Sequence, residues 1–178
     1  MTRRVWGLVV SEANPQRWAR EQALGSSPGI VSDRRPVQYT ADPVDARVYA
    51  AERRLRLRMA APPWDGCEPW FIDAEHAQVY VDLALSRVSA RWCRDPVTVI
   101  RRVHRPSAHY RGAIYLPTHD RRWMRGLIVL HELTHHLTQT QRDHHGKAFV
   151  DAFVEVLTVM YDSQAAGTFL GYLDGDHA

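Results

Sequence analysis

The sequence predicts an α+β domain, in which amphipathic helices pack with a short β-sheet. Apolar residues recur at helical spacing in three separate stretches, and β-branched or aromatic residues occur in two short runs between the first and the second of these. Of the 178 residues, 45% are apolar and 24% are charged, which is close to the composition of globular proteins. A chain of this length can enclose one core, so a single main domain is expected.

The first helix is expected over residues 43–59. Asp42 supplies an N-cap and Pro43 fits the first helical position, whereas the proline pair at 62–63 cannot continue the helix. Residues 1–40 contain several turn signals built from proline, glycine, serine and asparagine. They are expected to form an irregular N-terminal lead-in.

A second helix is expected to begin after its N-cap Asp73 and to continue to about Ala90, with apolar residues three and four positions apart. Two strands are expected after it, at Val97–Ile100 and Ala113–Leu116, because both runs are rich in β-branched or aromatic residues. The second strand ends at Pro117, which has no N–H to donate. This strand is therefore expected to suit the edge of the sheet.

The third helix, expected over residues 120–139, contains His131-Glu132-Leu133-Thr134-His135. Histidines four positions apart lie on one face of a helix, about 5–6 Å apart at Cβ, so both imidazoles can reach one tetrahedral metal ion. Glu132 lies about 100° around the helix from His131, where it can act on a water molecule as general base. Zn²⁺ is the expected cofactor, because imidazole ligands suit it.

A catalytic zinc ion needs a third protein ligand and one open position. The candidates downstream of the motif are His136, Asp143, His144, His145 and Glu155. His136 is turned away from the face of the two motif histidines, and Glu155 lacks the later aspartate of a thermolysin-like pattern. On the C-terminal helix the face of His145 continues into Phe149 and further apolar residues, whereas the face of His144 is mixed. Helix phase therefore favours His145 as the third ligand.

Several segments together resemble the core of SprT-like zincins, which are minimal zinc metallopeptidases. These segments are Tyr110–Pro117, Trp123, Leu127–His135 and His145–Phe149. In that family a His-Gly-x-x-Phe or His-Gly-x-x-Trp segment follows the motif helix, and His145–Phe149 matches it. Residues Val48–Glu52 are also similar to a segment that precedes the zinc motif in a group of actinobacterial proteins assigned as metallohydrolases.

This resemblance implies a small zincin-like fold, with a short mixed sheet above the active-site helix. Its edge strand, near Ala113–Leu116, would pair with an extended substrate. The resemblance carries the zinc ligands over to His131, His135 and His145, and the general base to Glu132. Some SprT-like relatives act on proteins crosslinked to DNA, but this chain lacks the Cys-x-x-Cys zinc ribbon that follows their catalytic domain, so dependence on DNA is not implied.

These patterns predict a zinc-dependent hydrolase, and most simply a metallopeptidase with a protein or peptide substrate. The metallohydrolase domain is expected over residues 41–165, followed by a C-terminal tail over 166–178. Two alternatives stay open. In a non-catalytic, zinc-stabilised binding module, His144 or Asp143 would close the fourth coordination position. In a regulatory peptidase, the substrate would be a repressor protein.

The basic residues offer a third alternative, a DNA-associated protein. The net charge is +3, and Lys147 is the single lysine among 23 lysine and arginine residues. Arginines cluster at 53–58, 101–102 and 121–125. Because arginine suits bidentate contacts with phosphate, weak nucleic-acid contact through these clusters is an open interpretation, although arginines on an outer helix face are more often simply solvated.

The protein is expected to be cytoplasmic and to have no membrane contact. No stretch reaches the roughly 18 apolar residues of a membrane-spanning helix. The basic N-terminus is followed by an apolar run that ends at Ser11-Glu12 without a signal-peptide cleavage site. Cys67 and Cys93 form no Cys-x-x-Cys pair, so neither a disulfide scaffold nor a thiolate zinc site is predicted.

Overall fold

The computed structural model describes residues 43–62, 64, 66–103, 107–110, 112–117, 119–138 and 145–175. The expected lead-in at 1–40 lies outside these residues. The described elements belong to one compact unit, residues 40–178, and their combination of helices with a small mixed sheet confirms the α+β class. In chain order they are α2 (Pro43–Met59), α3 (Ala74–Arg87), β1 (Thr98–Arg102), β2 (Ala108–Tyr110), β3 (Ala113–Pro117), the 3-10 turn η2 (Arg121–Trp123), α4 (Gly126–Leu137), α5 (Lys147–Met160) and α6 (Ser163–Asp174).

The first two expected helices are confirmed. α2 occupies the expected residues 43–59. Asp73 caps α3, because its side chain accepts the N–H of His76 at 2.9 Å. α3 ends at Arg87, earlier than the expected end near Ala90, since Val88 adopts extended backbone and buries its side chain in the core.

The sheet has the strand order β1-β3-β2, so β3 is its central strand. β1 runs parallel to β3, and the short β2 runs antiparallel to it with His109 opposite Ile114. The expectation that Ala113–Leu116 forms the edge strand is therefore wrong. Pro117 is tolerated in a central strand because it is the last residue of β3, where a missing N–H costs little. The edge strand β2 lies within the loop expected between the two predicted strands.

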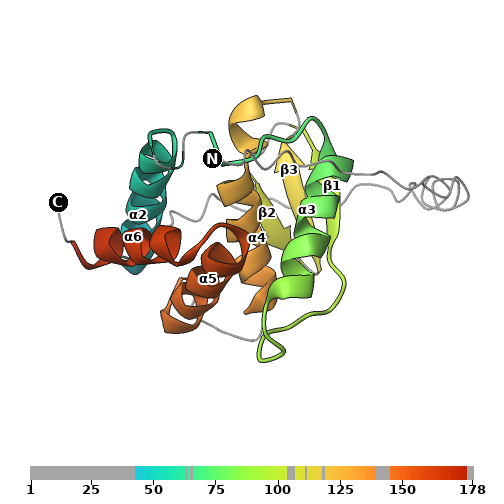
Figure 1. The fold of residues 1–178 in the computed structure, drawn as a ribbon. Coiled ribbons are helices and arrows are strands. Elements are labelled where there is room, and N and C mark those ends of the chain that lie inside the picture. Colours follow the sequence, from blue (N-terminus) through green and yellow to red (C-terminus); the bar gives the residue numbers. More distant parts are fainter. Residues whose placement is uncertain are drawn as a thin grey trace, which may run out of the picture. The chain divides into compact units, whose positions relative to one another are not determined.

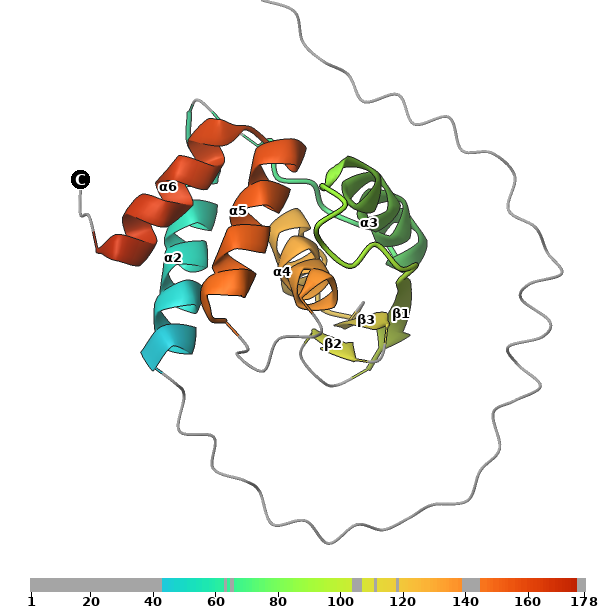
Figure 2. The same cartoon turned by 90° about the horizontal axis from the view of Figure 1, so that it is seen from below.

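α4 lies at the centre of the unit, with α5 on one side and the sheet on the other (Figures 1 and 2). α3 also packs against it. Ten of the 12 residues of α4 are buried. A helix that is apolar nearly all round is stable only when other elements cover it on every side. The polar side chains of the histidine motif are consequently held inside the protein.

α4 begins at Gly126, later than the expected start at Asp120. The side chain of Asp120 accepts the N–H of Arg122 at 2.9 Å, and this local hydrogen bond starts the η2 turn instead of the helix. Arg125 then pairs with Trp70 as an isolated antiparallel bridge. That bridge keeps the backbone extended immediately before α4, so the helix cannot begin earlier.

The segment expected to be a C-terminal tail, 166–178, is helical over most of its length, because residues up to 174 belong to α6. The side chain of Asp162 caps α6 by accepting the N–H of Ala165 at 2.7 Å. α6 packs against α2 and α5 (Figure 2), and its Phe169 is fully buried. Internal glycines, which have low helix propensity, conceal this helix in the sequence.

Gly126 is expected to tolerate no larger residue. A Cβ atom there would lie 2.7 Å from Pro69 Cδ and 2.7 Å from the Tyr161 hydroxyl. We expect Gly126→Ala to lower the free energy of unfolding by about 1–3 kcal/mol through overpacking, measured by urea denaturation. The control is Gly167→Ala on α6, where a Cβ meets nothing within 4 Å; it should stabilise the protein by about 0.5–1 kcal/mol. Equal effects of the two changes would contradict this packing argument.

Candidate metal centre

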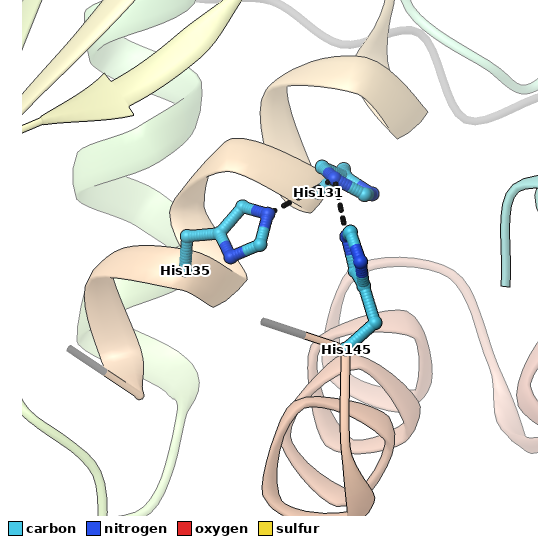
Figure 3. Close-up of side chains that lie close together, drawn as sticks. All are labelled: His131, His135 and His145. Carbon is cyan, nitrogen blue, oxygen red and sulfur yellow. Dashed lines mark hydrogen bonds between the residues drawn. The ribbon is translucent and has the colours of Figure 1, made fainter. Parts of the chain in front are cut away.

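Three imidazole rings converge between α4 and the start of α5 (Figure 3). His131 and His135 come from consecutive turns of α4, and His145 lies directly before Gly146, the N-cap residue of α5. The Nε2 atoms of His135 and His145 each lie 3.2 Å from Nε2 of His131. The ligand atoms of all three side chains lie within 4.8 Å of one another. The structure thus brings together the three histidines that the sequence analysis selected.

Aromatic packing holds these rings in place. The ring centroid of Phe149 lies 5.1, 4.8 and 4.6 Å from the centroids of His131, His135 and His145. Phe149 is itself buried, in the first turn of α5. Phe149 therefore belongs to the core and supports all three imidazoles. Because Phe149 lies four residues after His145, the apolar face of α5 correctly indicated that His145 points inwards.

The donor set fits a tetrahedral zinc ion. With Zn–N distances of about 2.0–2.1 Å, two ligand nitrogens of a tetrahedron lie about 3.3 Å apart, which is close to the two separations of 3.2 Å. Lone pairs of neutral imidazoles that point at one another repel, unless they share a cation. Within the described residues the group comprises three side chains. A tetrahedral ion held by them has one further position for water or substrate.

Two carboxylates that sequence reasoning missed contact these histidines. Glu52 Oε1 lies 2.5 Å from Nδ1 of His131, and Asp45 Oδ1 lies 2.6 Å from Nδ1 of His145. Burial disfavours a charged His131, but Glu52 together with Glu132 and Asp45 outweighs it and raises the pKa of that imidazole. Burial lowers the pKa of His145, although Asp45 favours its charged form. The sequence signals were the resemblance of the segment that ends at Glu52 and the spacing of seven residues, which places both carboxylates on one face of α2.

Glu132 is buried beside the histidines, with 6% of its surface exposed. Burial raises the pKa of its carboxyl group, although the nearby His131 and hydrogen bonds from the Ser107 side chain and the His109 backbone favour the ionised form. Ser107 directly precedes β2 and His109 belongs to it, so the edge strand holds this carboxylate. A buried carboxyl group with a raised pKa beside a histidine cluster is typical of a proton-transfer residue.

The other candidates for the third ligand either lie away from the three imidazoles or are outside the described residues. Glu155 contacts the segment after α3 and not the three imidazoles. His136 faces away from the site, where its Nε2 donates to the Asp95 carbonyl oxygen at 2.8 Å. Asp143 and His144 are outside the described residues.

Part of one arginine cluster has intramolecular partners. Arg125 forms an ion pair with the buried Glu68 at 3.2 Å. Arg122 pairs with Asp120 at 2.7 Å, but its side chain is 86% exposed, so this pair contributes little to stability. Contact between the arginine clusters and nucleic acid stays a prediction.

Comparison of the chain with protein-family models, curated proteins and solved structures found no match. The resemblance to SprT-like zincins accordingly stays a prediction, and the geometry of the site is what supports a function. Among the described residues, no helix has the length and apolar character needed to cross a lipid bilayer.

The three-histidine site is expected to bind one zinc ion per chain. His145→Ala should weaken zinc binding by more than the roughly 10–100-fold that a lost outer hydrogen bond costs, because it removes a ligand. His144→Ala is the control and should bind as the wild type does. Elemental analysis and competition with a chromogenic chelator measure both. Loss of zinc in the His144 variant alone would show that His145 is not the ligand.

Glu155 should make stability depend on pH. Its carboxylate accepts the N–H of Ser89 at 2.6 Å and side-chain N–H groups of Arg91 and Trp92 at 2.7 and 2.9 Å. Burial alone would raise the pKa of Glu155, but these hydrogen bonds lower it to about 2. Because the unfolded pKa is about 4.3, the ionised group stabilises the fold fully above that pH, and its contribution is lost as the pH falls towards 2.

Glu155→Gln is therefore expected to lower the free energy of unfolding by about 2–3 kcal/mol at neutral pH, and by much less near pH 2. Urea denaturation of chelator-treated wild type and variant at both pH values measures the difference without a contribution from metal. A loss that is the same at both values would contradict the assigned hydrogen bonds.

Proposed function

We propose that this chain is a zinc-dependent hydrolase of the zincin type, and specifically a metallopeptidase. The observation that carries the proposal is the convergence of His131, His135 and His145, with the buried Glu132 beside them. Three protein ligands with one open position are typical of catalytic zinc sites, whereas structural sites have four protein ligands. A motif helix packed against a short mixed sheet supports the zincin-like character of the fold.

Each residue of the proposed site would have its own chemical role. The three imidazoles would hold the metal through Nε2. The chemistry that a bound zinc ion supplies is Lewis-acid polarisation of a carbonyl and acidification of a water molecule. Glu132 would accept the proton of the attacking water at its carboxylate and return it to the nitrogen of the leaving amine. Ser107 and His109 orient that carboxylate through their hydrogen bonds.

We place an extended peptide substrate along β2 and not along Ala113–Leu116. Within the described residues β2 pairs with β3 alone, and an extended peptide would add to its other edge. This edge lies beside the general base, because the N–H of His109 donates to Glu132. The His109 ring also contacts α4, with its Nε2 3.3 Å from Nδ1 of His136. These contacts fix the strand relative to the site.

A non-catalytic zinc-stabilised module is the alternative that the same histidines would permit. It needs a fourth protein ligand, and the group within the described residues has three members. Asp143 and His144, the expected fourth ligands, lie outside those residues. X-ray absorption of the zinc-loaded protein separates the two functions, since four protein ligands without water would favour the module.

Glu132→Gln tests the proposed catalytic base. The variant is expected to retain zinc and to lose about 10²–10⁴-fold in cleavage rate, because an amide cannot accept the proton. The assay uses the zinc-loaded full-length chain, with casein, a repressor protein and a protein crosslinked to DNA as substrates. Glu75→Gln, at an exposed position of α3, is the matched control and should cleave as the wild type does.

Undiminished cleavage by Glu132→Gln would contradict the assigned role of Glu132. Loss of zinc together with cleavage would assign Glu132 to metal binding instead of proton transfer. A requirement for DNA that weakens steeply with salt would support contact through the arginine clusters, and cleavage of casein without DNA would not.

A further inference from the structure

One face of α2 is directed at the proposed metal ligands. Asp45, Tyr49 and Glu52 follow one another at intervals of four and three residues, so they share a face of this helix. The carboxylate side chains are only 28% and 16% exposed at Asp45 and Glu52. Carboxylates on the outer face of a helix are normally well solvated. Their partial burial shows that the histidines partly cover these two carboxylates, whereas Tyr49 between them is 53% exposed.

The hydrogen bonds from this face fix the tautomer of two imidazoles. An ionised carboxylate can only accept, so the short contacts of Glu52 and Asp45 place a hydrogen on Nδ1 of His131 and of His145. In a neutral ring the lone pair then belongs to Nε2. The Nε2 atoms of these two rings lie 3.2 Å apart, at the centre of the cluster. Each carboxylate therefore turns the metal-binding nitrogen of its partner inwards.

Tyr49 restrains the same two rings between the carboxylates. Its ring is stacked on His131 at a centroid distance of 5.3 Å and an interplanar angle of 21°. It meets His145 nearly edge-on, at 5.0 Å and 68°. Aromatic contacts of this geometry stabilise the observed ring orientations. Rotation of either imidazole would lose a carboxylate hydrogen bond and a tyrosine contact together.

α2 reaches the site from outside the layers that carry the ligands. His131 belongs to α4 and His145 directly precedes the N-cap of α5, whereas α2 packs against α6 (Figure 2). The two ligands come from different elements, and one rigid helix contacts both. α2 can therefore fix the position of one imidazole relative to the other.

We propose that Asp45 and Glu52 are positioning residues, through which α2 forms part of the metal centre. They hold His145 and His131 as Nδ1–H tautomers at the spacing that one divalent cation requires. This inference rests on the metal site proposed above and assigns to it two residues that are not ligands. Outer carboxylates of this kind typically change metal affinity by about 10–100-fold.

Zinc affinity of the full-length protein tests the proposal. The variants are Glu52→Ala, Glu52→Gln, Asp45→Ala and Asp45→Asn, with Glu75→Ala on α3 as control. The alanine variants should bind zinc about 10–100-fold more weakly. The amide variants should lose less, because an amide oxygen still accepts the Nδ1–H hydrogen. In the cobalt-substituted protein, the visible absorption bands should shift in the alanine variants, which reports a changed ligand geometry.

A zinc affinity that falls from wild type to amide variant to alanine variant distinguishes positioning from general destabilisation. Circular dichroism checks that each variant is folded. Zinc affinities within about twofold of the wild type in both alanine variants, with unchanged cobalt spectra, would overturn the proposal, since a lost outer hydrogen bond typically costs more.

A second measurement needs no metal. Nitrogen-detected NMR of the histidine rings, in metal-free protein at alkaline pH, reports which ring nitrogen carries hydrogen. The wild type should show Nδ1–H for His131 and His145, and the alanine variants should lose this preference. If the wild type binds no zinc, the proposed function fails, while this measurement still decides the positioning role. Tautomers that are unchanged in the alanine variants would overturn it.

Discussion

The burial of α4 is the constraint on which the rest of the structure depends. An apolar helix must be covered on every side, and α3, α5 and the sheet supply that cover. Inside the cover, each polar side chain of the helix must find a partner, because an unpaired buried group is costly. His131 forms a hydrogen bond with Glu52, and His136 with the Asp95 carbonyl group. Glu132 accepts hydrogen bonds from Ser107 and from the backbone of β2. These partners come from different parts of the chain, so the polar groups specify how the elements dock.

The same arrangement concentrates negative charge around the imidazoles. Glu132, Glu52 and Asp45 all lie close to His131 and influence its pKa. Carboxylates around neutral imidazoles favour a divalent cation, and a cation that binds only the folded site stabilises the fold by mass action. Binding of a metal ion at the proposed site would thus be linked to the docking of α2 and to the stability of the folded chain.

Local signals in the sequence account for the parts of the fold and site that could be predicted. The cap at Asp73 and the spacing of His131 and His135 act within one or two helical turns, and the phase of His145 depends on the helix that follows it. The sheet order, in contrast, depends on pairing between distant segments, and the three-residue β2 is too short to show a period. The spacing of Asp45 and Glu52 gave no indication of which element their face would meet. Only the packing of α2 against α6 decides that.

The carboxylate contacts of His131 and His145 join residues that are far apart in the chain. In sequence, 79 positions separate Glu52 from His131, and 100 separate Asp45 from His145. Contacts of such separation form late, because loop closure costs entropy before the contact is made. On the ribosome, α2 emerges well before the histidines and before α6, the helix on which it packs. The complete arrangement of histidines and carboxylates therefore exists only after α6 has been synthesised, and any metal ion bound there would be acquired late in the maturation of the protein.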